Sequence, residues 1–285
     1  MISGILNILK PAGMTSNAVL SKIKKILHPN KIGHLGTLDP SGTGVLPVCI
    51  NKATKLFDYY LKKDKEYRAI FVFGKDTDTL DSDGKILCQH DVDIKREDIE
   101  RILPKFFGKL EQMPPRYSAK KIDGQKAYEL ARNEVSFELR PKEVEIYDIR
   151  ILEKLAKNTY LFEIKCSSGT YIRSICRDIA KELNTFAYMG AIVRTKSGNF
   201  SIKDAKQLDF ISENDIVPLK KILKDRENAF VNDKFYDKII NGCEVEISAK
   251  DMEICVIYCK DELLGIGHIK NGKCKIDTNL RESYD

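Results

Sequence analysis

The order of apolar and polar residues predicts strands and helices that follow one another along most of the chain. Alternating or short apolar runs predict strands at 4–9, 67–73, 143–152 and 159–167. Apolar residues at helical spacing predict helices at 16–27, 53–61, 94–107 and 170–183. Ser16 is expected to cap the first helix. Residues 33–47 are too rich in glycine and proline for regular structure, and residues 76–84 are expected to form a polar loop.

The pattern changes character at Asn228. A short helix up to Ile240 is followed by two apolar strands, 254–258 and 263–269, and then by a turn at Asn271-Gly272. This part of the chain is therefore expected to form a small β-rich domain. Earlier in the chain, residues 113–137 are polar and basic between proline breaks, which indicates an excursion from the core.

Length and composition suit a globular protein with one large and one small domain. The chain has 285 residues, and its 42% hydrophobic fraction is enough for a packed core. No apolar run approaches the roughly 18 residues of a spanning helix, and no basic segment precedes a long apolar run near the start, so no secretory signal is expected. The eight cysteines include no Cys-x-x-Cys pair, which predicts reduced thiols in a cytoplasmic protein and no metal site.

Positive charge is concentrated at the front of the chain. The net charge is +6, but residues 1–75 alone carry 12 Lys/Arg against 4 Asp/Glu, whereas residues 228–285 carry 8 against 11. A basic front end indicates an anionic partner for the N-terminal half. Charge alone leaves open whether that partner is RNA, a membrane surface or an acidic protein, or whether the lysines are only a solvated face.

The most unusual segment, residues 33–47, contains one acidic residue, Asp39. It is the only acid among residues 1–57, which hold seven lysines. Pro40 disfavours the helical conformation at Asp39, and the surrounding positive charge keeps an isolated carboxylate ionised. Asp39 could therefore be a nucleophile or an anchor. From the pattern alone, an Asx-turn residue beside a proline is an equally good interpretation.

Seven segments in collinear order resemble the bacterial tRNA pseudouridine-55 synthases, the TruB family. The central one is Gly33-His34-Leu35-Gly36-Thr37-Leu38-Asp39-Pro40, continued by Gly42-Thr43-Gly44-Val45-Leu46-Pro47, which resembles the catalytic motif of that family. The others are Leu9-Lys10-Pro11-Ala12-Gly13-Met14-Thr15-Ser16, Lys65-Glu66-Tyr67-Arg68, 77–84, 114–119, Ser168-Gly169-Thr170-Tyr171-Ile172-Arg173-Ser174 and 193–200.

The resemblance implies both a fold and a reaction. The fold would be α+β: a pseudouridine synthase catalytic domain at 1–227 with a mixed, largely antiparallel sheet, then a PUA-like domain at 228–285. The reaction would convert a uridine in the T-arm stem-loop of tRNA to its C-glycoside isomer. It needs no cofactor, no nucleotide and no metal. The family further implies a monomer with no membrane partner, in which residues 113–137 clamp the T arm.

The resemblance also implies roles for individual residues. Asp39 would be the catalytic carboxylate, although the sequence leaves open whether it attacks the ribose or the base. Arg173 would pair with Asp39; otherwise it is a helix-surface residue. Tyr67 would stack on the target base and assist proton removal, whereas the strand pattern alone makes it a core aromatic.

Further residues would bind the substrate. His34 would enter the T-loop and fill the space left by flipped bases, and Tyr171 and Ile192 would line the pocket, with isoleucine where the family usually has leucine. The acidic loop with Thr77, Asp78 and Asp81 would position the backbone and Arg173.

Two rival functions share parts of this pattern. A tRNA-binding folding chaperone, with secondary or lost isomerase activity, would use the same basic surface but would not need Asp39. A hydrolase would direct Asp39 at another glycosidic bond, would need a second, proton-donating carboxyl, and would release a free base.

Overall fold

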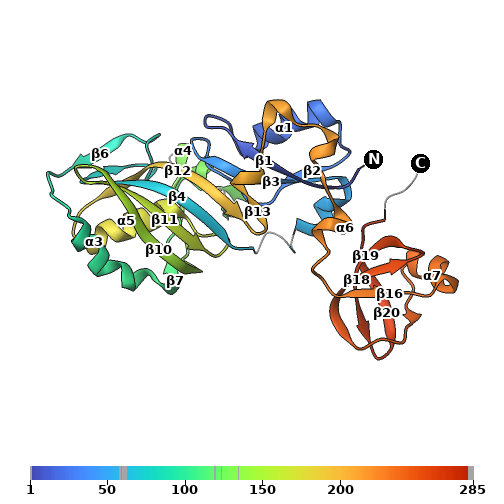
Figure 1. Cartoon of the computed structure of the whole chain (residues 1–285). Coiled ribbons are helices and arrows are strands. Elements are labelled where there is room, and N and C mark those ends of the chain that lie inside the picture. Colours follow the sequence, from blue (N-terminus) through green and yellow to red (C-terminus); the bar gives the residue numbers. More distant parts are fainter. Residues whose placement is uncertain are drawn as a thin grey trace.

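The computed structural model describes residues 2–57, 59, 63–118, 120–122, 124–133 and 135–281. Its two main β-sheets have 11 and five strands (Figure 1), and the five-stranded sheet lies at one end of the molecule, beyond helix α6 (Leu219–Ile222). Among the described residues, none of the helices combines the length and the apolarity that crossing a bilayer requires.

The large sheet has 11 strands and carries the candidate site. Its main path runs β14-β1-β3-β12-β4-β11-β10-β7, with β2, β13 and β15 attached at its side. Most pairs are antiparallel, but β12 pairs with β3 and β1 pairs with β14 in parallel, so the expected mixed, largely antiparallel sheet is confirmed. The strands are β1 (Gly4–Lys10), β2 (Ile32–His34), β3 (Thr43–Ile50), β4 (Lys65–Phe73), β7 (Gly108–Gln112), β10 (Lys142–Ala156), β11 (Thr159–Cys166), β12 (Ala187–Ser197), β13 (Phe200–Ser201), β14 (Lys206–Gln207) and β15 (Val217–Pro218).

Buried and less buried residues alternate strictly along β4 and β11, and the buried ones form the largest part of the core. Every second residue of each strand is buried on the same face, and Phe71 of β4 meets Phe162 of β11 with ring centroids 4.5 Å apart. Helix α5 (Ile172–Glu182) belongs to the same apolar cluster through Ile175 and Ile179. Since α5 begins just after the loop that follows β11, this packing fixes the place of its first turn.

Two further helices cover other parts of the large sheet. Helix α1 (Ser16–Leu27) buries Val19 and Ile23 in a cluster shared with β1 and β3. Helix α3 (Arg96–Ile102) continues as the 3₁₀ helix η2 (Leu103–Phe106), so the predicted helix changes form just before Pro104, as a proline requires.

Several predicted elements were wrong in detail. Thr15, not Ser16, caps α1, because the hydroxyl of Ser16 bonds to the backbone of Leu38 instead. Residues 33–47 are not wholly irregular, since β2 ends and β3 begins within them. The predicted helix at 53–61 begins earlier, as the 3₁₀ helix η1 (Asn51–Leu56); Asp58, Tyr60 and Leu61 lie outside the described residues.

The remaining segments of the first 227 residues form short elements. The predicted loop at 76–84 connects strand β5 (Lys75–Thr77), whose last residues it includes, to its antiparallel partner β6 (Ile86–Gln89). The basic excursion at 113–137 contains a two-stranded hairpin and a helix, and its residues 119, 123 and 134 lie outside the described part. The other elements are β8 (Lys121–Ile122), β9 (Gln125–Lys126), α4 (Ala127–Arg132), η3 (Ile202–Asp204), η4 (Leu208–Phe210) and η5 (Glu213–Asp215).

The last part of the chain forms the five-stranded sheet, in the order β16-β18-β19-β20-β17. The turn at Asn271-Gly272 has positive φ at both residues, 52° and 72°, as the sequence predicts for a tight hairpin between β19 and β20. The elements are β16 (Asn228–Phe230), η6 (Asp233–Phe235), α7 (Tyr236–Ile240), β17 (Val245–Glu246), β18 (Met252–Cys259), β19 (Glu262–Lys270) and β20 (Lys273–Asn279).

Candidate active site

Asp39 lies in the loop between β2 and β3, and neighbouring contacts hold this loop in place. The hydroxyl of Ser16 donates to the carbonyl oxygen of Leu38 (3.2 Å) and accepts from the Leu38 amide (3.0 Å). On the other side, the amide of Gly42 donates to the carbonyl oxygen of Asp39 (3.0 Å). The backbone is thus fixed immediately before and after Asp39, and 33% of its side chain stays exposed.

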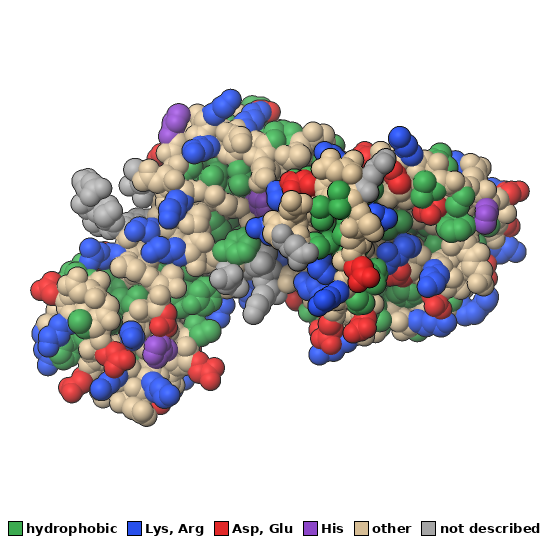
Figure 2. Space-filling view, turned by 180° about the vertical axis from the view of Figure 1, so that it is seen from behind, with side chains coloured by type: hydrophobic (Ala, Val, Ile, Leu, Met, Phe, Trp, Pro, Cys, Tyr) green, Lys and Arg blue, Asp and Glu red, His purple; other side chains and the backbone are tan. Residues whose placement is uncertain are grey.

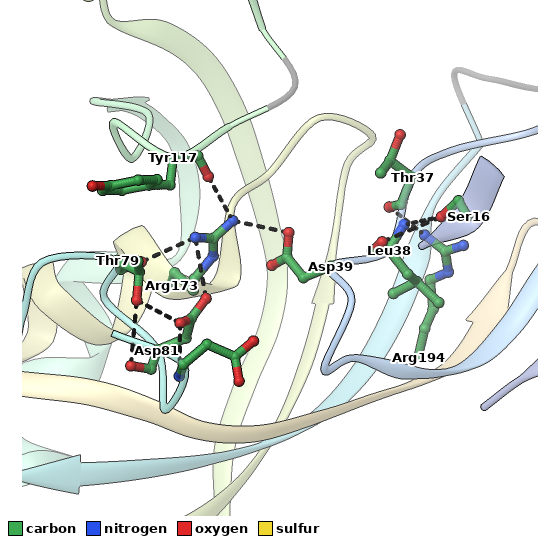
Figure 3. Close-up of polar contacts among 10 residues, drawn as sticks. Ser16, Thr37, Leu38, Asp39, Thr79, Asp81, Tyr117, Arg173 and Arg194 are labelled. Atoms are coloured by element: carbon green, nitrogen blue, oxygen red, sulfur yellow. Dashed lines mark hydrogen bonds and ion pairs between the residues drawn. The ribbon is translucent and has the colours of Figure 1, made fainter. Parts of the chain in front are cut away.

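Arg173, in the first turn of α5, points its guanidinium at Asp39 (Figure 3). Nη2 of Arg173 donates to Oδ1 of Asp39 at 2.9 Å and to the carbonyl oxygen of Tyr117 at 3.0 Å. Nη1 donates to the carbonyl oxygen of Thr79 at 3.0 Å and pairs with Oδ2 of Asp81 at 3.2 Å. The Arg173 side chain is only 6% exposed. Four acceptors therefore fix the plane of the guanidinium that faces Asp39.

Asp81 is a second carboxylate on Arg173, but it is buried, with 7% of its side chain exposed. Oδ1 of Asp81 accepts from the Thr79 hydroxyl (2.6 Å) and from the Asp83 amide (3.2 Å). Burial raises the pKa of Asp81, an effect that the Thr79 hydrogen bond and the Arg173 charge partly offset. The acidic loop thus supports Arg173 through Asp81, as expected for that loop.

A cavity of about 590 Å³ opens beside this ion pair. Asp39 is the one acid among its described lining residues, and the volume is in the range of small-molecule sites. The structure brings together five of the six predicted site residues in its wall, which are Asp39, Tyr67, Tyr171, Arg173 and Ile192.

The two tyrosines of the wall are held in different ways. Tyr67 is 7% exposed on β4, and burial raises its pKa to about 12, an effect that the charge of Arg194 partly offsets. Tyr171 precedes α5, and its backbone amide and carbonyl both bond to the side chain of Gln112 (2.8 and 3.1 Å). Burial raises the pKa of Tyr171 as well, so both phenols stay protonated at neutral pH.

His34 is the predicted site residue that the cavity does not include. It ends β2, opposite Val48 of β3. Burial, followed by the positive charge of Arg194, lowers the pKa of His34, so its ring is mainly neutral at pH 7. Within the described part of the chain, its Nδ1 is buried without a hydrogen-bond partner.

Arg194 of β12 is a site residue that sequence reasoning missed. It is 1% exposed, and its guanidinium donates to the carbonyl oxygens of Gly36 (3.0 Å), Thr37 (3.3 Å) and Val45 (2.7 Å). It therefore holds both ends of the loop that carries Asp39, and Figure 3 shows its guanidinium beside Thr37. The one sequence signal was the glycine-rich loop: Gly44 has φ 104°, and a Cβ there would lie 2.3 Å from the Arg194 carbonyl oxygen. Only a residue without a Cβ allows the two backbones to come this close.

Replacing Arg194 with methionine is expected to lower the free energy of unfolding by about 2–5 kcal/mol, because three carbonyl oxygens of the loop lose their buried donor. Denaturant unfolding measures the loss. Arg150→Met is the matched control, since Arg150 is exposed and, among the described residues, its ion pair is with Glu163 at the surface, where such pairs contribute little to stability. Equal losses in the two variants would contradict the assigned role of Arg194.

Lys10 and Lys65 are buried lysines at the base of the site. Nζ of Lys10 donates to the carbonyl oxygen of Pro40 (3.0 Å), beside Asp39. Burial lowers the pKa of Lys10 to about 8, an effect that the charge of Asp39 partly offsets. Burial and the charge of Arg194 likewise lower the pKa of Lys65 to about 8. The acidic group of the site therefore lies in a positive environment at neutral pH.

The Lys10→Met substitution is expected to change how stability depends on pH. The pKa of Lys10 is about 8 in the folded chain against an ordinary 10.5, so the unfolded state binds more protons between these values. Stability from this lysine therefore increases as pH rises from about 8 to 10.5. Across that window the original protein should gain about 1–3 kcal/mol relative to the variant. Denaturant unfolding at both ends of the window measures the difference, and parallel pH curves would contradict the depressed pKa.

Comparison with known proteins identifies the family. Residues 24–172 match the model described as TruB family pseudouridylate synthase (N terminal domain). The tRNA pseudouridine synthase B of Alkaliphilus oremlandii (strain OhILAs) is 38% identical over 283 residues, which cover 95% of this chain and 94% of that protein. That of Clostridium novyi (strain NT) is 40% identical over 291 residues, covering 98% and 100%. The chain belongs to the TruB family.

Solved structures show that the similarity includes the fold and covers almost the whole of this chain. A chain in a crystal structure of a Cbf5-Nop10-Gar1 complex superposes with a TM-score of 0.71 and 26% identity, covering 97% of this chain and 84% of that one. A chain in the structure of an H/ACA RNP bound to a substrate RNA containing 2'-deoxyuridine gives the same TM-score at 24% identity. The α+β fold class expected from the sequence is confirmed.

The cavity of this TruB family member has the geometry to bind one small, flat substrate group and to place it beside Asp39. A partly exposed carboxylate is aimed into a cavity by a rigid arginine, and the cavity wall offers Tyr67 and Ile192 as flat and apolar surfaces. A carboxylate held in this way can attack an electrophilic carbon directly. The described lining residues provide no second carboxyl to donate a proton.

Proposed function

We propose that this chain isomerises uridine 55 in the T arm of tRNA to pseudouridine, with Asp39 as the nucleophile. The observation that carries the proposal is the 2.9 Å ion pair between Arg173 and Asp39, at the edge of a cavity of about 590 Å³. The relatives that this chain matches along nearly their whole length are named tRNA pseudouridine synthase B.

The target uridine has to leave the base stack of the RNA loop before Asp39 can reach it. Extruding a base costs a few kcal/mol, and stacking of the base on Tyr67 returns about 1–3 kcal/mol. Ile192 and Tyr171 form the remaining walls around the base. His34 lies on β2, outside the cavity, and fills the space that the flipped base leaves in the RNA loop.

The reaction exchanges one bond of the nucleoside for another. The glycosidic C–N bond breaks, the uracil turns, and a C–C bond forms between the ribose and C5 of the base. The proton on C5 is then lost and N1, released from the ribose, takes up a proton, so the product has the mass of the substrate. Asp39 acts on either the ribose or the base and is regenerated, and Tyr67 assists the removal of the proton. Arg173 keeps the Asp39 carboxylate aimed throughout.

The other parts of the chain serve RNA binding. Residues 113–137 clamp the T arm through basic residues such as Arg116 and Lys126. Residues 1–227 are the catalytic domain, and residues 228–285 are a PUA-like domain behind it. The enzyme works as a monomer in the cytoplasm, where its tRNA substrate is made.

The test is to incubate the purified protein with an unmodified T-arm stem-loop and to map the product. The expected result is pseudouridine at position 55 only, with no free uracil. Release of free uracil would identify the rival glycosidic hydrolase, and an unchanged stem-loop would remove the enzymatic proposal. The described cavity wall, with Asp39 as its one acid, does not favour a hydrolase that needs a carboxyl pair.

A further inference from the structure

Three lysines gather on one surface away from the cavity. Lys52 and Lys55 lie on the 3₁₀ helix η1, where residues three apart project from the same side. Lys31 joins them through Asn51: the Asn51 amide donates to the Lys31 carbonyl oxygen (2.8 Å), and Oδ1 of Asn51 accepts from the Lys31 amide (3.3 Å). Lys31, Lys52 and Lys55 are called the junction lysines below.

The backbone that carries the junction lysines is fixed. Asn51 adopts φ 53°, a left-handed conformation that asparagine tolerates. Its side chain bonds to three backbone groups: Oδ1 accepts from Asn30 (2.9 Å) and from Lys31, and Nδ2 donates to the carbonyl oxygen of Ile2 (2.9 Å). The three lysines are thus presented from a rigid base, so little backbone ordering is needed to bind a ligand there.

The positive charge of the cluster is uncompensated among the described residues. None of the junction lysines forms an ion pair with a described carboxylate, whereas Lys22 pairs with Asp209 and Lys105 with Glu182. The cations also affect one another: after burial, the charges of Lys52 and Lys31 lower the pKa of Lys55. An anion bound between them would relieve this repulsion.

The position of the junction lysines indicates which kind of anion they would bind. Lys31 precedes β2, which leads through His34 to the Asp39 loop. Nζ of Lys55 donates to the carbonyl oxygen of Asn279 in β20, so the cluster lies where the five-stranded sheet meets the rest of the chain. Lys and Arg side chains gather at this junction in Figure 2. Lysines act as point charges on phosphates, and contacts of this kind carry no sequence information.

We propose that the junction lysines bind backbone phosphates of the RNA duplex that continues from the T arm, outside the loop that enters the cavity. This inference rests on the proposed function. It also explains how a C-terminal domain of net negative charge can adjoin an RNA-binding surface: the domain contributes position, and the lysines of the preceding domain contribute the charge.

The test compares two RNAs with one variant. The full chain carrying Lys31→Gln, Lys52→Gln and Lys55→Gln is titrated with unmodified full-length tRNA and with the isolated T-arm stem-loop at several salt concentrations. For full-length tRNA the affinity should fall at least about tenfold, and the slope of log affinity against log salt should decrease by about 2–3. Affinity for the stem-loop, which lacks the continuing duplex, should change by less than about twofold.

A matched control removes the same charge elsewhere. Lys95→Gln, Lys154→Gln and Lys181→Gln change exposed lysines at the end of the large sheet where α3 and α5 lie (Figure 1). This triple variant should bind full-length tRNA within about twofold of the original protein. Unfolding midpoints of both triple variants show that each is folded.

Three results would overturn the inference. The first is full-length tRNA binding that weakens no more in the junction variant than in the control. The second is an equal loss for the stem-loop, which would place the lysines on the T arm itself. The third is lost binding to vesicles with anionic lipid while tRNA binding stays unchanged, which would identify a membrane surface. Failure of the proposed function is seen separately, as a lack of pseudouridine with the unsubstituted protein.

Discussion

Replacing Asp39 with asparagine is expected to abolish pseudouridine formation, with a rate at least about 10³-fold lower, because the amide has no charge and is a poor nucleophile. The amide keeps the shape of the carboxylate and can still accept from Arg173. Binding of tRNA should therefore stay within about tenfold, or about 1.4 kcal/mol. Single-turnover assays with the unmodified stem-loop measure the rate, and titration measures binding.

The control for this prediction is Asp91→Asn, since Asp91 is an exposed aspartate that pairs with Lys157 far from the cavity. It should leave the rate within about twofold. Retained turnover in the Asp39→Asn protein would be decisive against the assignment of Asp39. The same variant tests the chaperone alternative in a tRNA refolding assay, because refolding without turnover would show a function that does not need the carboxylate.

Replacing Arg173 with lysine is expected to lower the rate by about 10²–10³-fold, although the positive charge is kept. The guanidinium bonds to Asp39, Asp81 and the carbonyl oxygens of Thr79 and Tyr117 at once. A lysine has a single nitrogen and cannot span these acceptors, so it aims the Asp39 carboxylate poorly. Single-turnover rates at saturating RNA measure the loss apart from binding.

Arg177→Lys is the matched substitution for this experiment, one helical turn further along α5. Arg177 is about one third exposed and pairs with Asp178, its neighbour in the chain, so the rate should change by less than about threefold. Near-normal turnover in the Arg173→Lys protein would show that a point charge is sufficient and would remove the positioning role of Arg173.

The spacing of apolar residues predicted those strands and helices that bury one face in the core. Alternation in 67–73 and helical spacing in 170–183 correspond to β4 and α5, because their buried faces depend on local period alone. The glycine-rich segment was predicted less well. Part of this segment forms strand β3. Gly44 of β3 has a positive φ and no Cβ, so β3 can lie close to the backbone of Arg194 in β12. Such a contact depends on a residue 150 positions away.

The candidate site was predicted only in part from the residues themselves. Isolation of Asp39 among lysines indicated an ionised carboxylate, but its pairing with Arg173 came from the family resemblance, because residues 134 positions apart share no local signal. Arg194 and Lys10 were missed as supports of the loop. In sequence they are ordinary basic residues, and only the fold shows that both are buried against its carbonyl oxygens.

The most direct test of the central claim is a structure of the Asp39→Asn protein bound to an unmodified T-arm stem-loop. The account predicts that uridine 55 is out of its stack, lies in the cavity against Tyr67 and Ile192, and places its glycosidic bond within about 4 Å of the side chain at position 39. Arg173 should keep its contact with that side chain. A uridine that stays stacked in the RNA loop, or that binds away from this cavity, would contradict the account.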